Sequence, residues 1–511
     1  MDRADPFTGY SVILRVLLYV VIPAFGVWQF FRLRRALHVF QLEAYKRHWF
    51  RRWLKEDPHR ALFIESTKDA KKPLVMTGRA WRTLVTAELL SILAILLPSA
   101  GAHLLGGAPY DLITAGVTMV LVFWGAPYIL LAADVLMAPV QRSINARFLA
   151  VAGRKLREVG PTVIGVTGSY GKTSTKAAIA HLIGPADEVQ ATPGSFNTPL
   201  GVSRTINENL EPGHKWFVVE MGARQEGDVA EISRFVSPAI GVLTAIGPAH
   251  LESFGSIESV TRAKSELIEN LPSHGFAVMN VDDAGVRAVA DATSGVTVVR
   301  YGIDDEGRPD VTARDLLVTE KGTAMTIVDR RTDARLPVQT KLLGRHAVGH
   351  VLAGVAVALA VGRSLDELAG AIASLEPVEH RLQIIAGAGG VTVIDDAYNS
   401  NPLGAAAALD LLELMPGRMK VVVTPGMVEL GEVQRTANEE FGRQAAAVAD
   451  TLIVVARLNR DAIVTGARSA GTDVNVIVVD SLGAATEELK GLLGAGDVVL
   501  FENDLPDQYE E

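Results

Sequence analysis

Three long apolar runs near the N-terminus constrain most strongly how this chain can fold. They cover residues 11–31, 83–105 and 112–138. A helix of about 20 apolar residues crosses the hydrocarbon core of a bilayer, so each run predicts a transmembrane helix. The hydrophobic share of the whole chain, 49%, is high for a soluble enzyme, and these runs explain part of it.

Each apolar run also contains proline or an ionisable residue, namely Arg15, Pro23, Glu88, Pro98, Pro127 and Asp134. Polar side chains near helix ends can extend to the membrane interface, and a role in substrate transit is the alternative. A cleaved signal peptide is the other interpretation of the first run. It is disfavoured because arginines, rather than small residues, follow the run.

Basic residues are distributed unevenly around the three runs. Residues 32–82 contain 14 Lys and Arg, whereas residues 106–111 contain none. By the positive-inside rule the N-terminus faces out and everything after Arg142 is cytoplasmic, as in a multi-pass protein of a bacterial-type inner membrane. Within the basic segment, residues 41–55 mix aromatic and basic side chains, which predicts an amphipathic helix at the membrane interface, with a solvated linker as the alternative.

From Arg154 onward, short β-branched runs alternate with alanine-rich stretches. This pattern is typical of βα units in an α/β fold with a largely parallel sheet. One series of predicted strands covers residues 163–166, 216–220, 241–245 and 277–280, and a second covers residues 391–395, 421–423, 452–455, 474–479 and 498–500. We therefore expect a transmembrane region at 1–150, a central P-loop ATPase-like domain at 151–378 and a doubly wound, Rossmann-like domain at 379–511.

The overall charge and the lack of cysteine narrow the classes of function. A net charge of −9 argues against nucleic acid as a partner, because phosphate neutralisation needs a basic face. The chain has no cysteine, which excludes disulfides, thiolate metal sites and a cysteine nucleophile.

The strand predicted at 163–166 is followed by TGSYGKTS and then by a predicted helix. This arrangement is typical of a phosphate loop, whose backbone N–H groups and helix N-terminus bind phosphate oxygens. The predicted nucleotide-binding residues are Gly168, Ser169, Gly171, Lys172, Thr173 and Ser174. Lys172 would contribute charge at the terminal phosphates, and the Thr173 hydroxyl would bind Mg²⁺. Glu220 ends the next apolar strand, where a carboxylate is placed to bind Mg²⁺.

The compact TGSYGKTS loop resembles that of the Mur ligase family, and further motifs follow in that family's order from about residue 160 to about residue 435. The resemblance implies that His250, in IGPAHLE, and Lys264, in AKSE, help to hold a second Mg²⁺, with Lys264 as a carbamate. A lysine forms a carbamate only as the neutral amine, so this site should lower its pKa.

The resemblance extends to nucleotide and substrate contacts. Arg381 would reach the γ-phosphate and Asp396 the ribose of ATP, and His346 and His350 would lie on the adenine side. The family's usual asparagines are replaced there by Ala347 and His350, which puts the adenine contacts in doubt. The positions that match substrate-facing loops are Thr192, Asn197, Thr198, Tyr398, Asn399 and Asn401.

The resemblance implies an ATP-dependent carbon–nitrogen ligase. The acceptor carboxylate would attack the γ-phosphate to form an acyl-phosphate, and the amine of an amino acid or dipeptide would then attack the carbonyl carbon. The motif strings are most similar to the branch that adds D-alanyl-D-alanine to the muramoyl tripeptide. The apolar runs, however, occupy the place of that branch's UDP-binding domain, which favours a lipid-linked acceptor in envelope-precursor synthesis. Two C-terminal segments, 424–431 and 500–507, also depart from the branch's pattern, so we expect the amine pocket to differ from that of the branch.

Three other functions remain open at the level of sequence. The first is a polymer-forming ligase of the poly-γ-glutamate capsule type, since such relatives also lack the UDP-binding domain. The second is an ATP-driven membrane transport component, although no transporter signature accompanies the phosphate loop. The third is a nucleotide-binding scaffold without catalysis.

Overall fold

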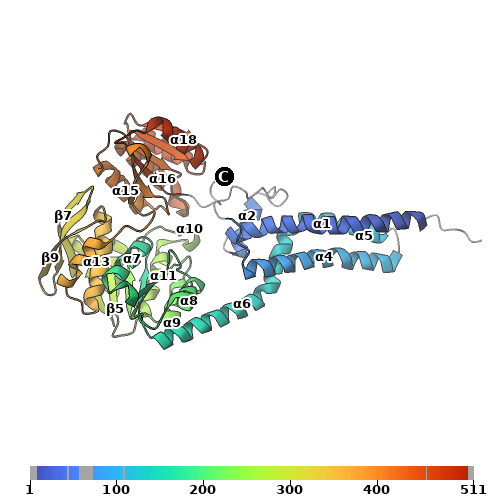
Figure 1. Cartoon of the computed structure of the whole chain (residues 1–511), viewed down its shortest axis with the longest axis horizontal. Coiled ribbons are helices and arrows are strands. Elements are labelled where there is room, and N and C mark those ends of the chain that lie inside the picture. The colour runs from blue at the N-terminus through green and yellow to red at the C-terminus, as the bar shows by residue number, and fades with distance from the viewer. Residues whose placement is uncertain (1–7, 43–44, 57–72, 107–109, 456, 505–511) are drawn as a thin grey trace, which may run out of the picture. The chain divides into compact units, whose positions relative to one another are not determined.

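The computed structural model describes residues 8–42, 45–56, 73–106, 110–455 and 457–504 (Figure 1). The chain divides into two compact units, one helical up to Arg147 and one α/β from Phe148. The predicted domain boundary between residues 378 and 379 lies inside the α/β unit and stays a prediction. Residues 57–72 of the basic segment and the C-terminal run from residue 505 lie outside the described residues.

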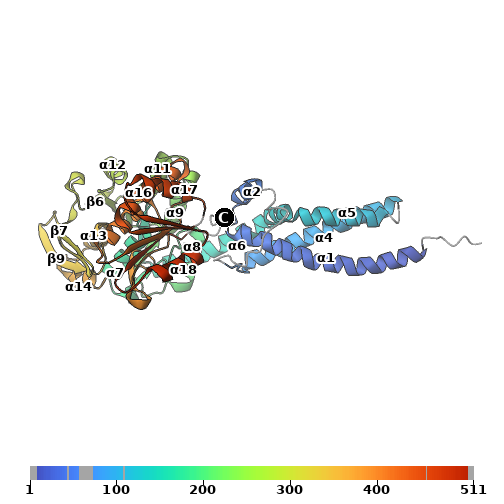
Figure 2. The same cartoon turned by 90° about the horizontal axis from the view of Figure 1, so that it is seen from above.

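The helical unit contains long helices that pack through small and aliphatic side chains. The described helices are α1 (Thr8–Leu42), α2 (Arg47–Glu56), α4 (Gly78–Gly106), α5 (Tyr110–Trp124) and α6 (Ala126–Val159). Leu37 and Phe40 of α1, Leu84 of α4 and Leu130 of α6 are fully buried in its core. Figures 1 and 2 show α1, α4 and α5 running alongside one another.

The third apolar run is not the single helix that the sequence predicts. The chain bends by 78° between α5 and α6. Pro127 has no N–H to donate to the carbonyl of Phe123, four residues earlier. Arg32 replaces the missing donor, because its Nε donates to that carbonyl at 2.6 Å, and Gln29 Nε2 donates to the carbonyl of Val122 at 3.2 Å. Expecting one continuous helix over 112–138 was therefore wrong.

Part of this unit has the length and apolar composition that a membrane-spanning helix needs. Among the described residues α4 passes both criteria, and the bent α5–α6 pair passes if the two helices form one span. The side chains of residues 8–19 lie outside those described, so the first span stays a prediction. Leu97, Leu104, Leu105 and Leu121 are each exposed over half or more of their side chain.

The predicted interfacial helix is shorter than expected. Helix α2 begins at Arg47, whereas Gln41 and Leu42 still belong to α1. Phe50 is fully buried against Phe40, with ring centroids 5.2 Å apart, and Leu54 is buried beside it. Phe50 and Leu54 of α2 therefore pack on the core of their own unit, and the position of α2 at a membrane interface stays a prediction.

The first half of the α/β unit is a nine-stranded sheet in the order β2-β3-β1-β4-β5-β6-β7-β8-β9. Its strands are β1 (Thr162–Thr167), β2 (Val189–Ala191), β3 (Trp216–Glu220), β4 (Ile240–Leu243), β5 (Phe276–Asn280), β6 (Thr297–Tyr301), β7 (Val311–Thr319), β8 (Gly322–Asp329) and β9 (Ala334–Thr340). The strands from β2 to β6 are parallel. The strand order reverses beside β1, and ligands of α/β proteins bind at such switch points.

Two sets of helices cover the two faces of this sheet (Figures 1 and 2). On one face lie α7 (Lys172–Leu182) and α13 (Arg345–Ala360), which share a core with the sheet. On the other lie α8 (Pro199–Asn209), α9 (Asp228–Val236), α11 (Ile257–Glu269) and α12 (Ala284–Ala292). The short helices α10 (Leu251–Phe254) and α14 (Ala369–Ser374) complete this half.

The far edge of the nine-stranded sheet departs from the expected parallel pattern. Strands β7, β8 and β9 pair antiparallel, and the β7–β8 ladder contains an irregularity between Arg314 and Leu317. Short connections at residues 320–321 and 330–333 join these strands, and two antiparallel neighbours need no crossover helix. The sequence analysis missed this meander, because it named no strand between residues 281 and 390 and expected a largely parallel sheet.

The second half is a six-stranded sheet in the order β10-β11-β15-β12-β13-β14. Its strands are β10 (Gln383–Ala386), β11 (Thr392–Asp396), β12 (Lys420–Thr424), β13 (Thr451–Val455), β14 (Asn475–Val479) and β15 (Val498–Glu502). All pairs are parallel except β10–β11. Helices α15 (Pro402–Leu414), α16 (Gln434–Val448) and α17 (Arg460–Ser469) cover one face, and α18 (Leu482–Leu492) covers the other. The nine strands expected from sequence in the two series are all present.

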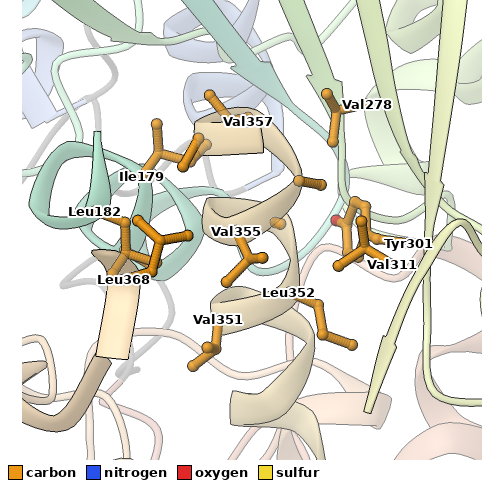
Figure 3. Close-up of a cluster of buried hydrophobic side chains, with 14 of the residues drawn as sticks. Ile179, Leu182, Val278, Tyr301, Val311, Val351, Leu352, Val355, Val357 and Leu368 are labelled. Carbon is orange, nitrogen blue, oxygen red and sulfur yellow. The ribbon is translucent and has the colours of Figure 1, made fainter. Parts of the chain in front are cut away.

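Helix α13 forms the centre of the larger core (Figure 3). Val351, Leu352 and Val355 are fully buried, and so are Ile179 of α7 and Val278 of β5 in the same cluster. This packing fixes α13 against α7, the helix that begins at the phosphate loop.

We predict that Leu352→Ala destabilises the α/β unit by about 2–5 kcal/mol, because it leaves a cavity in a core that cannot fully collapse. Chemical unfolding followed by tryptophan fluorescence measures the loss. Leu403→Ala, at a side chain that is 62% exposed, is the matched control and should change stability by less than about 0.5 kcal/mol. Equal effects of the two substitutions would contradict this placement of α13.

Candidate active site

The loop between β1 and α7 has the geometry of a phosphate-binding cradle. Gly168 and Gly171 have φ angles of +148° and +74°, which favour glycine. A Cβ at Gly168 would lie 2.0 Å from Thr244 Oγ1, so no side chain fits there. The loop opens directly into α7, whose first N–H groups are free to bind an anion. The predicted phosphate loop therefore has the local structure that its chemistry needs.

Lys172 lies inside this loop. Its Nζ donates to the carbonyls of Gly168 at 2.8 Å and Ser169 at 3.2 Å. Burial lowers the pKa of the Lys172 ammonium, and the carboxylate of Glu220 opposes that shift. The lysine is thus held within the cradle, where a phosphate group would compensate for the cost of burying its charge.

Glu220 is the centre of a buried polar cluster. Its carboxylate, on a residue 1% exposed, accepts from Thr173 Oγ1 at 3.0 Å, Lys176 Nζ at 3.1 Å and Asn197 Nδ2 at 3.1 Å. The Thr192 hydroxyl accepts from the Glu220 backbone N–H at 3.1 Å. Sequence reasoning missed Lys176, although its spacing of four from Lys172 places both on one face of α7.

This cluster fits a magnesium ion. Within the described ranges no group of three or more His, Asp or Glu side chains could by itself hold a metal. A nucleotide-bound Mg²⁺ needs fewer protein ligands, because phosphate oxygens and waters supply the rest. Thr173 and Glu220, hydrogen-bonded to each other, are the hydroxyl and carboxylate that such an ion takes.

Three residues expected to meet the substrate have structural partners here. Thr192 and Asn197 bond to Glu220, as described above, and the Thr198 side chain accepts from the Gly201 N–H at 3.2 Å as the N-cap of α8. These contacts hold the loop beside the phosphate cradle. Their direct contact with a substrate stays a prediction.

Lys264 and His250, the other expected metal-binding residues, lie near the charge of Lys172. Lys264 is 2% exposed on α11, and burial, reinforced by Lys172, lowers its pKa to about 7. His250 precedes α10 with a φ of +56°. Burial is the main cause that lowers the pKa of its imidazole, and a hydrogen bond with Glu429 opposes the shift. Glu429 was not expected at this site.

A cavity of about 510 Å³ adjoins the phosphate loop. Eight of the predicted residues line it: Gly171, Ser174, His346, His350, Arg381, Asp396, Asn399 and Asn401. The sequence analysis missed the remainder of the wall, which includes Asn280, Asp282, Tyr301, Leu343 and Pro377. Asn280 is the last residue of β5 and Asp282 follows the strand, so the rule that ligands bind at the carboxyl ends of strands was the available signal.

The two histidines of α13 form an uncharged part of this wall. Burial lowers the pKa of His346 to about 4 and that of His350 to about 3. His350 Nδ1 lies 2.9 Å from Thr175 Oγ1, and its ring would meet a Cβ at Gly171, 2.8 Å away. Neutral imidazoles suit a planar heterocycle better than an anion, which is consistent with the adenine side of a nucleotide site.

Arg381 lies on the segment that connects the two sheets. Its guanidinium stands 4.3 Å from the Tyr398 ring centroid, and its Nη1 donates to the carbonyl of Asn399 at 3.4 Å. Burial lowers the pKa of Arg381, and the carboxylate of Asp396 counteracts this. Asn401 caps α15 by accepting from the Gly404 N–H at 2.9 Å. The predicted substrate loop is therefore ordered around a buried cation.

A phosphate cradle beside a carboxylate cluster, with an arginine on the segment that leads into a second Rossmann-like sheet, is typical of nucleotide-dependent ligases built from two α/β halves. Gly171 of the cradle and Arg381 line the same cavity. Residues 166–358 match the model of the Mur ligase middle domain, and residues 380–502 match that of the Mur ligase, glutamate ligase domain. The chain belongs to the Mur ligase family. It is an ATP-dependent enzyme that forms a carbon–nitrogen bond with release of ADP and phosphate.

Curated relatives and solved structures agree with this assignment. The UDP-N-acetylmuramoyl-tripeptide–D-alanyl-D-alanine ligase of Mycobacterium tuberculosis is 35% identical over 70% of this chain and 73% of its own length. The ligase of that name from Escherichia coli is 32% identical over 57% of this chain and 63% of its own. The structure of MurF from Thermotoga maritima in complex with ADP has a TM-score of 0.62 at 28% identity, covering 70% of this chain and 80% of its own.

Asp396 gives a testable dependence of stability on pH. Burial, together with the carboxylate of Glu502, raises its pKa to about 7, above the value of about 3.9 expected in the unfolded chain. The folded state therefore binds more protons between these values, and stability falls as pH rises from about 4 to about 7, by up to about 1.4 kcal/mol per pH unit from this group.

We expect Asp396→Asn to flatten this part of the stability profile, as measured by denaturant unfolding at several pH values. Asp410→Asn, at an exposed position of α15, should leave the wild-type slope in place. An unchanged slope in Asp396→Asn would show that Asp396 titrates normally.

Proposed function

We propose that this protein is a membrane-anchored ligase that joins the amine of an amino acid or dipeptide to the carboxylate of an envelope-precursor acceptor. The observation that carries this proposal is the meeting of Lys172, the Glu220 cluster and Arg381 around one site. Phosphoryl transfer from ATP depends mainly on positioning and on opposing the phosphate charge, and these groups supply both.

Different residues of the site serve different parts of the proposed reaction. Lys172 and Arg381 oppose the charge on the transferring phosphoryl group while an acceptor carboxylate oxygen bonds to the γ-phosphorus and ADP leaves. The amine then attacks the carbonyl carbon of the acyl-phosphate and loses a proton as inorganic phosphate departs. Thr173 and Glu220 would hold Mg²⁺, and His250 and Lys264 a second ion. Bound Mg²⁺ supplies further positive charge at the phosphates.

The names of the relatives guide the choice of substrates. Those relatives are named for joining D-alanyl-D-alanine to a UDP-N-acetylmuramoyl tripeptide. The Mycobacterium tuberculosis and Escherichia coli enzymes match 70% and 57% of this chain. We therefore take a dipeptide as the first candidate amine, in peptidoglycan precursor synthesis. The apolar N-terminal helices favour a lipid-linked acceptor over a UDP-linked one.

The helical unit supplies the proposed anchor. Helix α4 and the bent α5–α6 pair meet the criteria of length and composition for crossing a membrane, and α1 covers the remaining predicted span. The proposed location is a bacterial-type inner membrane, with the N-terminus outside, three spans and the catalytic region in the cytoplasm. The basic residues between the first two spans support this orientation.

An assay of detergent-solubilised protein for ADP and phosphate release tests the ligase and its substrates together. A panel of amino acids and dipeptides is combined with UDP-linked and lipid-linked acceptors. We expect release to need both an acceptor and an amine and to favour the lipid-linked acceptor. Lys172→Ala should abolish release, because the cradle then lacks its own positive charge at the terminal phosphates. Lys490→Ala, at an exposed surface position, is the control.

Other outcomes of this assay distinguish the alternatives. Preference for the UDP-linked acceptor would overturn the lipid-linked proposal while keeping the ligase. Repeated addition of a single amino acid would indicate a polymer-forming enzyme. ADP release that needs neither acceptor nor amine would contradict the ligase itself.

We further propose that Lys264 becomes carbamylated. The lysine is buried, and its pKa of about 7 leaves a large fraction as neutral amine at pH 8. Incubation with ¹³C-bicarbonate should give a carbamate carbon resonance that Lys264→Arg abolishes and Lys490→Arg retains. The same signal in all three proteins would exclude a carbamate at Lys264.

A further inference from the structure

Glu429 lies in the loop after β12, within the segment 424–431 that departs from the branch's pattern, and its carboxylate reaches the central half. Its carboxylate hydrogen-bonds to His250 Nδ1 and its Oε1 lies 3.6 Å from Arg224 Nη2. Glu429 and His250 both adopt left-handed backbone conformations, with φ angles of +63° and +56°. A non-glycine residue persists in this region only when its surroundings hold it there, and such residues cluster at functional sites.

His250 and Arg224, two partners of Glu429, lie in the loops that carry or adjoin the predicted metal-binding residues. Arg224 follows β3, the strand that ends at Glu220, and His250 follows β4. Gly431 approaches the same region, because a Cβ there would lie 3.4 Å from the Glu252 nitrogen. One carboxylate of the C-terminal half thus contacts both central loops.

The loop that carries Glu429 is firmly anchored. Thr424 Oγ1 donates to Glu502 at 2.7 Å, and Asn503 Nδ2 donates to the Gly426 carbonyl at 2.5 Å. Asn438 accepts from the Met427 N–H at 2.8 Å and donates to its carbonyl at 2.9 Å. Side chains from separate elements thus satisfy the loop backbone, so Glu429 projects from a fixed platform.

We propose that Glu429 is a positioning residue that sets the orientation and tautomer of His250. A carboxylate that accepts from Nδ1–H leaves the Nε2 lone pair free to bind a metal or accept a proton. Because Glu429 belongs to the C-terminal half, the His250 imidazole has this orientation and tautomer only when the two halves are in contact.

A simple stabilising clamp is the competing explanation. Arg224 is 45% exposed and 3.6 Å from the carboxylate, and exposed pairs contribute about 1 kcal/mol or less. The partly buried contact with His250 is therefore the one expected to matter. Removing a simple clamp would change stability alone. Removing a positioning residue would also change the orientation and tautomer of the His250 imidazole.

The test uses the full-length detergent-solubilised protein with ¹⁵N-labelled histidine. Glu429→Ala and Glu429→Gln are compared with Glu432→Gln, a matched control at an exposed glutamate of the same loop region. The His250 resonances are identified as those lost in His250→Gln. Wild type and the control should show the Nδ1–H tautomer, Glu429→Ala a mixture of tautomers, and Glu429→Gln an intermediate state, because its amide oxygen still accepts.

The kinetic consequences rest on the proposed ligase function. Loss of a group that orients a histidine costs about 10–100-fold in activity, so kcat of Glu429→Ala should fall by about that factor while the KM for ATP changes less than about threefold. Glu429→Gln should recover part of the loss. Thermal unfolding shows whether each variant folds. If Glu429→Ala does not fold, Glu429→Gln takes its place in the kinetic and spectroscopic comparison.

Two results would overturn the proposal: an unchanged His250 tautomer in a folded Glu429 variant, or a kcat for Glu429→Ala equal to that of Glu432→Gln. A wild-type protein that releases no ADP with any acceptor or amine would instead refute the ligase, and the histidine spectra would still decide the role of Glu429.

Discussion

The site depends on the hydrogen bonds that the buried carboxylate of Glu220 accepts. A buried charge is tolerated only when close partners compensate for the lost hydration. The Glu220 carboxylate has three such partners: Thr173 and Lys176 on α7, and Asn197 in the loop before α8. These partners hold the phosphate loop, the neighbouring loop and β3 in one arrangement. The site is thus pre-formed by electrostatic pairing, and the paired Lys176 limits the cost of burying the acidic group.

The parallel parts of the fold could be predicted from sequence because each strand is buried on both faces. Runs such as those of β1 and β13 are almost continuously apolar, and glycine or polar residues mark their ends. The β7–β9 meander carries no such signature, since its strands alternate buried and exposed side chains and the connections are short. The break at Pro127 was visible as a proline, but its consequence depended on Arg32, which is distant in sequence and takes over the freed carbonyl.

In the candidate site, too, a residue whose role depends on distant parts of the chain could not be predicted from the sequence. Residues at strand ends or in the phosphate loop, such as Lys172, Glu220 and Asp396, could be predicted because the local pattern fixes their place. Glu429 could not, since its role arises from the contact between two halves that the chain joins only through the segment around Arg381. The cavity wall formed by Tyr301 and Pro377 was missed for a related reason: an apolar residue gives no sign in the sequence of whether it faces a core or a ligand.

The anchoring of the Glu429 loop has a consequence for the order of folding. Strand β15 inserts between β11 and β12, and the bonds from Thr424 to Glu502 and from Asn503 to Gly426 span 78 and 77 residues. Contacts of such long range form late, because the loop-closure entropy must be overcome before they contribute any stability. Helices α16 and α17 and strands β13 and β14 can therefore assemble around a loop that is not yet fixed. Because Glu429 projects from that loop, its contact with His250 depends on β15 having its place between β11 and β12.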